Sequence, residues 1–554
     1  MATGTHFRSS AQGAISILVS QAEFDALDER PSDYPRSLDA STSVSRVKRD
    51  FLEALSAAGS VRRIDAQNER ELREARTALA SPGTIYASFH ETPPPTACRL
   101  LQHTKGGLML PGGFLGGWTF RDATVNLVET ERQKTQLTAA FGAGTPRLGV
   151  FAQRLPDETF APRTVAARSA ARLVRGVSDS TTHLLYAGRW IANKGLVQVA
   201  RALNIWPLAD ARFTIVGDFE DDFLISQSDG VHLNFRDFFR REVLACSPAL
   251  QIELVPTTSQ RQLHEWYTSA DAFICPSFHE DEASGNAAHE AVLSGVPAIV
   301  TDWCGLGQLG RNTRGGAVAT YSTLGGVRFS LAGLRASIDL AERFRARFDE
   351  STARADAEWV RDTFDPSRMR ASIRSAVDLL AGLPAEPPPM GGWRCAERVQ
   401  RIASIAPEGF KRAILEAGTP PPSGLFVDGG GCGGDPTVSL PHLLQAIQSM
   451  YTTWPTPPTV RRGMLLRGFW RVSLWPDERA LVEFGFPGPR LLRFVEADWV
   501  AVLACATALA RGEFEFRPTS DAASRALQRA VDLGYLVPDV LGADSFDRGA
   551  AIVE

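Results

Sequence analysis

Short apolar runs alternate with amphipathic stretches through roughly the first two thirds of the chain. Buried strands are predicted at 14–19, 84–89, 123–128, 149–152, 184–187, 212–216, 252–255, 272–275 and 296–300. Apolar residues at helical spacing predict helices at 47–57, 68–80, 131–141, 236–245, 261–268, 287–294, 332–348 and 366–380. Strands that alternate with helices indicate α/β architecture with open parallel sheets.

One strand–loop–helix unit, residues 272–302, contains a pair of glutamates. Glu282 is predicted in the loop and Glu290 in the helix, eight residues apart, and the helix begins just after Ser284. A helix N-terminus offers free N–H groups to a phosphate, and carboxylates accept hydrogen bonds from sugar hydroxyls. The alternative is a solvated acidic loop followed by an ordinary helix glutamate.

A second unit, residues 183–196, reads HLLYAGRWIANKGL and brings two cations to a helix start. Arg189 and Lys194 follow an apolar strand and precede the next helix. Open α/β sheets bind ligands at this place, and both side chains are good phosphate donors. The alternative for each is an ordinary surface charge.

Three segments together resemble glycosyltransferase family 4, a retaining, nucleotide-sugar-dependent family with two Rossmann-like domains in the GT-B fold. They read GRWIANKG at 188–195, SADAFICPSFHEDEASGNAAHEAVLSGVPAIVTD at 269–302 and VFAQRLPDETFAP at 150–162. The similarity covers roughly residues 13–382. It implies an N-terminal acceptor-side domain at 13–165 and a nucleotide-sugar-binding domain at 166–382.

The resemblance also implies roles for the candidate residues. Arg189 and Lys194 would hold the diphosphate, Glu282 would contact hydroxyls of the donor sugar, and Glu290 would contact the nucleotide ribose. Residues 302–309 are expected to be a loop near the donor phosphates. The predicted donor-binding residues are Gly188, Arg189, Lys194, Glu282, Ser284, Gly285, Asn286 and Glu290. The predicted catalytic residues are His90, Arg189, Lys194 and Glu282.

The N-terminal domain departs from the family pattern in one place. The loop after its first strand is long and acidic rather than glycine-rich, which puts the usual contact there in doubt. His90 follows strand 84–89 at the ligand-binding end of the predicted sheet, so it is a candidate for the acceptor side or the reaction centre. The alternative is a histidine satisfied within a loop.

Composition and charge limit the partners and the cellular compartment that we expect. The net charge of −4 and the mixed charge pattern indicate no nucleic-acid partner. Seven scattered cysteines without CxxC spacing favour a reducing cytosol. We expect a cytoplasmic protein, because no signal peptide or transmembrane segment is evident. No DxD pair follows strand 212–216, so metal-independent transfer without a cofactor is expected.

The remaining chain lies outside the resemblance. Residues 383–436 form a Pro/Gly-rich linker region with a helical stretch at 396–415, and 437–541 read as a small accessory domain of α+β or winged-helix-like type. Helices are predicted there at 441–451, 499–510 and 521–533, with strands at 469–475, 480–485 and 491–495. We interpret this domain as a recognition or assembly module for the acceptor, a peptide or a partner protein, without chemistry of its own.

The predicted function is a retaining transfer of a hexose from a nucleoside-diphosphate sugar to an unknown acceptor. The alternative is a catalytically silent nucleotide-sugar-binding scaffold for the C-terminal module, which the unusual first loop favours. A third hypothesis is phosphorolysis of a glucan on the same fold. It would need a lysine that binds pyridoxal phosphate, and no lysine can be assigned to that role from the sequence.

Overall fold

The computed structural model describes well over half of the chain. The described residues are 15–21, 43–65, 68–89, 99–103, 124–141, 147–151, 159–219, 224–226, 232–234, 237, 239, 250–278, 282, 284–323, 326–383, 457–484, 490–509 and 513–539. The chain divides into two compact units. The first unit comprises Met1–Pro35, Ala40–Arg154 and Phe364–Met450, and the second comprises Arg36–Asp39, Leu155–Thr363 and Tyr451–Glu554.

The first unit is built on a six-stranded parallel sheet with the order β2-β1-β3-β4-β5-β6. Its strands are β1 (Ser16–Ser20), β2 (Ser60–Ile64), β3 (Thr84–Phe89), β4 (Leu100–His103), β5 (Thr124–Val128) and β6 (Arg147–Val150). Its helices are α2 (Ser43–Ala58), α3 (Glu69–Leu79), α5 (Glu131–Phe141) and α14 (Pro366–Ala381). Apolar side chains of α2 and α14 bury one face of the sheet, and α3 packs against Leu18, Tyr86 and Leu100. Helix α14 thus returns a late part of the chain to the first unit.

The second unit contains another six-stranded parallel sheet, with the order β11-β8-β7-β12-β13-β14. Its strands are β7 (Thr182–Ala187), β8 (Ala211–Val216), β11 (Leu250–Val255), β12 (Ala272–Cys275), β13 (Ala298–Thr301) and β14 (Gly316–Val318). Its helices are α6 (Val165–Val174), the 3₁₀ turn η2 (Ala192–Lys194), α7 (Leu196–Ile205), α9 (Gln260–Ser269), α10 (Asn286–Leu293), α11 (Cys304–Asn312), α12 (Leu331–Ala346) and α13 (Glu350–Thr363). Two hairpins accompany this sheet: β9 (Leu224–Ser226) with β10 (His232–Asn234), and β15 (Thr320–Thr323) with β16 (Gly326–Phe329).

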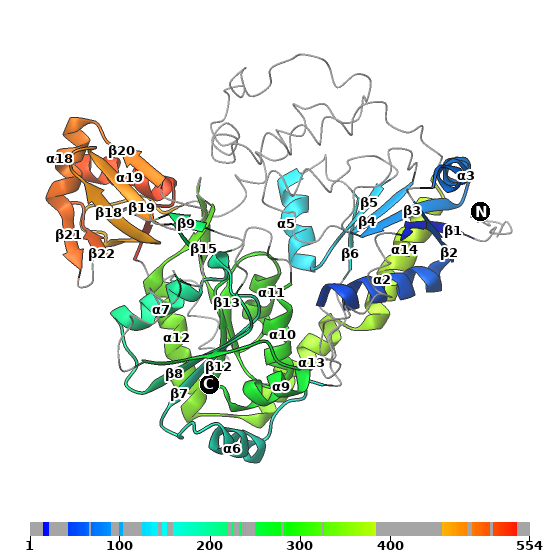
Figure 1. Cartoon of the computed structure of the whole chain (residues 1–554), viewed down its shortest axis with the longest axis horizontal. Helices are drawn as coiled ribbons and strands as arrows, with labels where there is room; N and C mark the ends of the chain where they lie inside the picture. The colour runs from blue at the N-terminus through cyan, green and yellow to red at the C-terminus, as the bar shows by residue number, and fades with distance from the viewer. Residues whose placement is uncertain are drawn as a thin grey trace, which may run out of the picture. The chain divides into compact units, whose positions relative to one another are not determined.

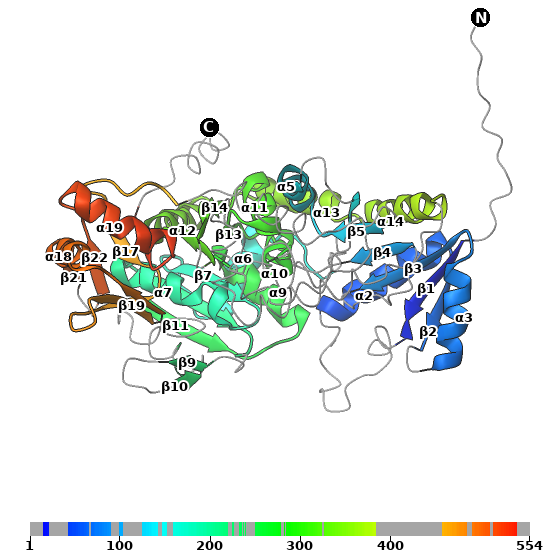
Figure 2. The same ribbon diagram turned by 90° about the horizontal axis from the view of Figure 1, so that it is seen from above.

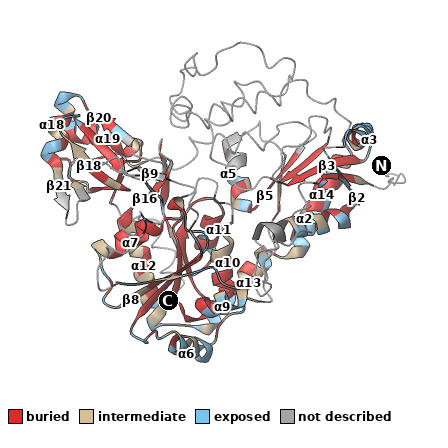
Figure 3. Cartoon of the chain, viewed as in Figure 1, coloured by how far each residue is buried: buried red, intermediate tan, exposed pale blue. Residues whose placement is uncertain are grey.

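Helices cover both faces of this second sheet, with α7 and α12 on one side and α9 and α10 on the other (Figures 1 and 2). The central strands are buried, whereas the outer face of α6 is exposed (Figure 3). Central strands buried on both faces explain the continuous apolar runs in the sequence. Among the helices that the structure describes, none is both long and apolar enough to cross a membrane.

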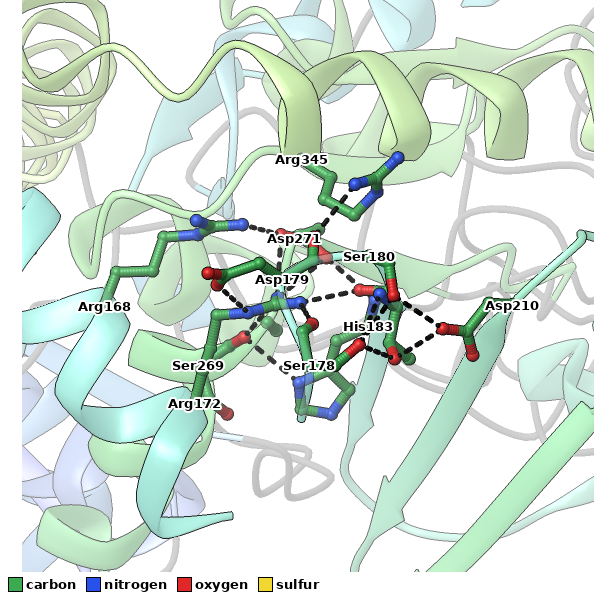
Figure 4. Close-up of polar contacts among 12 residues, drawn as sticks. Arg168, Arg172, Ser178, Asp179, Ser180, His183, Asp210, Ser269, Asp271 and Arg345 are labelled. Carbon is green, nitrogen blue, oxygen red and sulfur yellow. Dashed lines mark hydrogen bonds and ion pairs between the residues drawn. The ribbon is translucent and has the colours of Figure 1, made fainter. Parts of the chain in front are cut away.

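A buried ion-pair cluster holds the amino-terminal edge of the second sheet (Figure 4). Asp271 precedes β12, and its carboxylate accepts hydrogen bonds from Arg172 at 3.0 and 3.1 Å and from the backbone N–H of His183 at 2.8 Å. Arg168 also donates to Asp271. Burial lowers the pKa of His183 to about 4. Since Arg172 is occupied by internal partners, this cluster is structural, and it lies at the edge opposite the helix starts described below.

The C-terminal module, which we define as residues 457–539, contains two small antiparallel sheets and two helices. Its strands are β17 (Leu466–Gly468), β18 (Arg471–Trp475), β19 (Ala480–Phe484), β20 (Arg490–Arg493), β21 (Ala506–Leu509), β22 (Glu513–Phe516) and β23 (Leu536–Pro538). Its helices are α18 (Glu496–Cys505) and α19 (Asp521–Asp532). The module has an apolar core of its own, which includes Leu466, Trp499 and Leu527.

The predicted fold class is confirmed: two Rossmann-like sheets give a GT-B-like α/β fold, with additional small antiparallel sheets near the C-terminus. Some elements differ from the prediction. Residues 302–309, expected to be a loop, include the start of helix α11, and the helix expected at 499–510 ends at Cys505 and is followed by β21. Among the elements that the sequence did not predict are β2, β4, β14, α6 and α13.

Several other expectations fall outside the described residues. These are His90, most of the linker region 383–436 with its helical stretch, the helix at 441–451, and most of the helix at 236–245. The domain boundaries stay predictions.

Candidate functional site

Three adjacent strands of the second sheet end beside three helix starts. Strands β7, β12 and β13 are neighbours, and they lead into α7, α10 and α11. None of these three helices has a side-chain hydrogen bond at its N-cap. We call this region the carboxyl edge. The strand order reverses between β7 and β12, and ligands of open α/β sheets bind at such a reversal.

The loop after β7 presents Arg189 and Lys194. The Tyr186 hydroxyl donates to the carbonyl of Arg189 at 2.7 Å, and the N–H of Trp190 donates to the carbonyl of Asp218 at 2.9 Å. The loop backbone is therefore held, while the Arg189 side chain lies at the surface. Such an arrangement offers a cation to a ligand without a need to reorganise the backbone.

Gly195 brings this loop against the loop after β12. Its φ of 78° is left-handed, and a Cβ at this position would lie 2.4 Å from the carbonyl oxygen of Pro276. Any other residue would be both strained and in collision. The N–H of Phe278 donates to the carbonyl of Asn193 at 2.9 Å, which joins the two loops a second time.

Lys194 and Glu282, assigned separate roles from the sequence, contact each other directly. The Lys194 ammonium donates to the Glu282 carboxylate, and the Ser277 hydroxyl donates to the same oxygen at 2.6 Å. Their side chains are only 16% and 11% exposed. Partial burial favours this pairing of opposite charges, since neither would be well solvated alone. The pair joins the turn before α7 to the loop before α10.

Helix α10 supplies the other candidates. Gly285 is its N-cap with a φ of 72°, and the Ser284 hydroxyl donates to the Asn286 side-chain oxygen at 3.0 Å. Glu290 is buried in the second turn. Burial, together with the nearby charge of Glu290, raises the pKa of Tyr267 well above its ordinary value, so this phenol stays neutral. It donates to the carbonyl of Ala287 at 3.0 Å.

Helix α11 is a feature that the sequence analysis missed. Its N-cap, Trp303, is fully buried, and Asp302 just before it accepts a 2.8 Å hydrogen bond from Arg311 within the helix. The start of α11 adds backbone N–H groups at the carboxyl edge, where a loop was expected. Three helix N-termini with partial positive charge favour a polyanionic ligand such as a diphosphate.

The nearby thiol of Cys275 is buried, which disfavours the thiolate form that a nucleophile needs. Cys275, the last residue of β12, is buried, and desolvation raises the pKa of its thiol to about 12. The carboxyl edge therefore combines cations, carboxylates and helix dipoles, which bind and stabilise charge.

This arrangement agrees with the sequence comparison. Residues 171–321 match the family described as glycosyl transferases group 1. This part of the chain is a group 1 glycosyltransferase domain. It includes β7, β12, β13 and the carboxyl edge.

Two curated relatives are similar to this chain over longer stretches. A D-inositol 3-phosphate glycosyltransferase from Pseudarthrobacter chlorophenolicus is 28% identical over 236 residues, which are 42% of this chain and 49% of the relative. Another protein with that description, from Paenarthrobacter aurescens, is 29% identical over 190 residues, or 33% of this chain and 42% of the relative. The chain thus spans about half the length of the curated relatives that it matches. Among solved structures, a sucrose-phosphate synthase from Thermosynechococcus elongatus is 14% identical, with a TM-score of 0.45, over 66% of this chain and 99% of that chain.

Proposed function

We propose that the protein is a retaining glycosyltransferase that moves a hexose from a nucleoside-diphosphate sugar to an acceptor. The observation that carries this proposal is the contact of Lys194 with Glu282 beside three helix N-termini at the strand reversal. A diphosphate needs cations and N–H donors, and a sugar needs carboxylate acceptors. The group 1 glycosyltransferase domain supports the same conclusion.

In this mechanism the leaving diphosphate is stabilised by Arg189, Lys194 and the N-terminus of α10. Charge stabilisation of a leaving group is usually a large catalytic contribution, and loss of one such donor costs roughly 100-fold or more in rate. Glu282 accepts hydrogen bonds from hydroxyls of the donor sugar, and Glu290 contacts the ribose. His90 serves the acceptor side. Transfer proceeds without a metal or cofactor.

The proposed setting is the cytoplasm. The two cysteines that the structure describes as free, Cys275 and Cys505, are buried thiols, as is common in a reducing compartment. The acceptor is unknown. Residues 437–541 are the proposed binding region for a peptide or a partner protein.

A thermal-shift panel of UDP-, GDP-, TDP- and ADP-sugars tests donor recognition. A ligand that binds only the folded state raises the melting temperature, so one base should stand out in the panel. The same panel with the Lys194→Ala variant should show a clearly smaller shift at equal ligand concentration. If no nucleotide sugar stabilises the wild-type protein, the proposed function is refuted.

A catalytically silent sugar-nucleotide scaffold is the second candidate, because the first loop of the chain lacks the family's glycine-rich pattern. Such a scaffold would bind a donor in the panel and leave it intact. Mass spectrometry of the bound donor after incubation distinguishes binding from transfer or hydrolysis.

A further inference from the structure

Two aromatic residues of the C-terminal module do not lie in its own core. Phe469 and Trp470 follow β17 and are 0% and 1% exposed. Figures 1 and 2 both show the orange-to-red module beside α7 and α12. We call Phe469 and Trp470 the aromatic wedge.

The rings of the wedge pack on Phe278, which directly follows Ser277 in the loop after β12. The ring centroids of Phe278 lie 5.0 Å from Phe469 and 5.8 Å from Trp470, both edge-on. Phe329 of strand β16 lies 5.1 Å from Phe469 and 6.3 Å from Phe278, measured between ring centroids. The wedge thus fixes the Phe278 ring within an aromatic cluster.

Buried polar contacts anchor the wedge to α7. Arg201 donates to the carbonyl of Phe469 at 2.8 Å and to that of Gly468 at 3.2 Å, and Gln198 donates to the Phe469 carbonyl at 3.3 Å. Arg328 donates to the carbonyl of Gly534 at 2.9 Å, and its guanidinium lies 4.7 Å from the Phe469 ring centroid. Such buried charge-assisted contacts are costly to break, so the module is held firmly on the sheet domain.

The wedge is connected to the carboxyl edge by short steps. Phe278 donates its N–H to the carbonyl of Asn193, the residue before Lys194. Ser277, the residue before Phe278, donates its hydroxyl to Glu282. Displacement of the Phe278 ring would therefore disturb both members of the Lys194–Glu282 pair.

We propose that Phe469 and Trp470 are positioning residues for the donor site, which act through Phe278 on Lys194 and Glu282. The C-terminal module is then a structural part of the nucleotide-sugar site in addition to any role toward an acceptor. This inference rests on the proposed function, because it concerns the affinity of the same site for a nucleoside diphosphate.

Calorimetric titration of the full chain with UDP, GDP, ADP and TDP tests this proposal. With the nucleotide that the wild type binds, Phe469→Ala should weaken binding roughly threefold to tenfold. The affinity of Phe469→Leu should lie between those of the wild type and Phe469→Ala. The matched control is Leu527→Ala in the module's own core, a substitution of similar cost to folding that leaves the wedge intact. It should lower the melting temperature and leave the dissociation constant unchanged.

A double-mutant cycle tests whether Phe469 affects nucleotide binding through Phe278. If the wedge acts through Phe278, the Phe278→Ala/Phe469→Ala variant should bind the nucleotide no more weakly than Phe278→Ala alone. Additive losses, or equal affinities for Phe469→Ala and Leu527→Ala, would overturn the proposal. If Phe469→Ala does not fold, Phe469→Leu and Phe278→Leu form the same cycle. A wild-type protein that binds none of the four nucleotides would instead refute the proposed function.

Discussion

Lys194→Ala should weaken binding of a nucleoside diphosphate, whereas Glu282→Gln should not. Both residues share one partly buried contact, so removal of either changes the other. A charge-assisted hydrogen bond contributes about 1.5–3 kcal/mol, and each 1.4 kcal/mol is about tenfold in affinity. Lys194→Ala should therefore weaken nucleoside-diphosphate binding by about 10- to 100-fold.

Glu282→Gln removes the negative charge that competes with a phosphate for Lys194. The amide oxygen can still accept from the Ser277 hydroxyl, which lies 2.6 Å from the carboxylate. Affinity for the nucleoside diphosphate should stay within about threefold of wild type or become tighter. The extra affinity for the sugar nucleotide over the diphosphate should be lost, since the carboxylate acceptor for the sugar is gone.

Thermal unfolding gives an independent check on the pair. Lys194→Ala leaves the Glu282 carboxylate, 11% exposed, without its cation, which should cost about 1–3 kcal/mol. For a domain of this size the melting temperature should fall by roughly 2–4 °C per kcal/mol. Adding Glu282→Gln should recover part of the loss. Equal losses of diphosphate affinity in the two single variants, or unchanged affinity in Lys194→Ala, would refute this reasoning.

Four further predictions follow from other features. Gly195→Ala should destabilise the protein by more than about 1 kcal/mol and weaken nucleotide binding, because the left-handed backbone and the Pro276 carbonyl leave no room; an unchanged melting temperature would contradict this. Deletion of 457–539 should give an insoluble or unstable chain, since it removes the partners of Phe278 and Arg201; a soluble product with wild-type affinity by calorimetry would contradict it. Burial lowers the pKa of His183 from 6.5 to about 4 in the folded state, so between these pH values the unfolded state binds a proton that the folded state does not. The denaturant concentration at the midpoint of unfolding should therefore drop as the pH falls from 6.5 to 4, and it should drop less in His183→Gln. Sugar transfer should persist in EDTA, and loss of activity that magnesium or manganese restores would show a missed metal site.

Much of the fold could be predicted because parallel strands buried on both faces leave a direct pattern in the sequence. Strands 84–89 and 272–275 and helix 131–141 agree with β3, β12 and α5. Helix α11 could not be predicted from propensity, since its sequence, CGLGQLGRN, contains three glycines. Packing explains one of them: a Cβ at Gly310 would lie 2.9 Å from a Val300 side-chain carbon and 3.0 Å from Ala317 Cβ. Close approach of the helix to the sheet thus outweighs its low helix propensity.

The candidate residues could be found from the sequence, but their mutual contacts could not. Spacing placed Arg189 and Lys194 after one strand and Glu282 after another, and the structure adds that Lys194 and Glu282 touch. The packing of the C-terminal module on the sheet domain also could not be predicted from the sequence. Its contacts join residues about 270 positions apart, such as Arg201 and Phe469, and no local pattern reports such a pair.

Mass spectrometry of nucleoside diphosphate released from sugar nucleotides shows whether the protein transfers or cleaves a donor. The full chain is incubated with each UDP-, GDP-, TDP- and ADP-sugar, with Lys194→Ala as the matched control. We expect the wild-type protein to cleave or transfer the sugar from at least one donor, and Lys194→Ala to be slower by roughly 100-fold or more. Donors left intact by the wild type, or equal rates for the two proteins, would contradict this expectation.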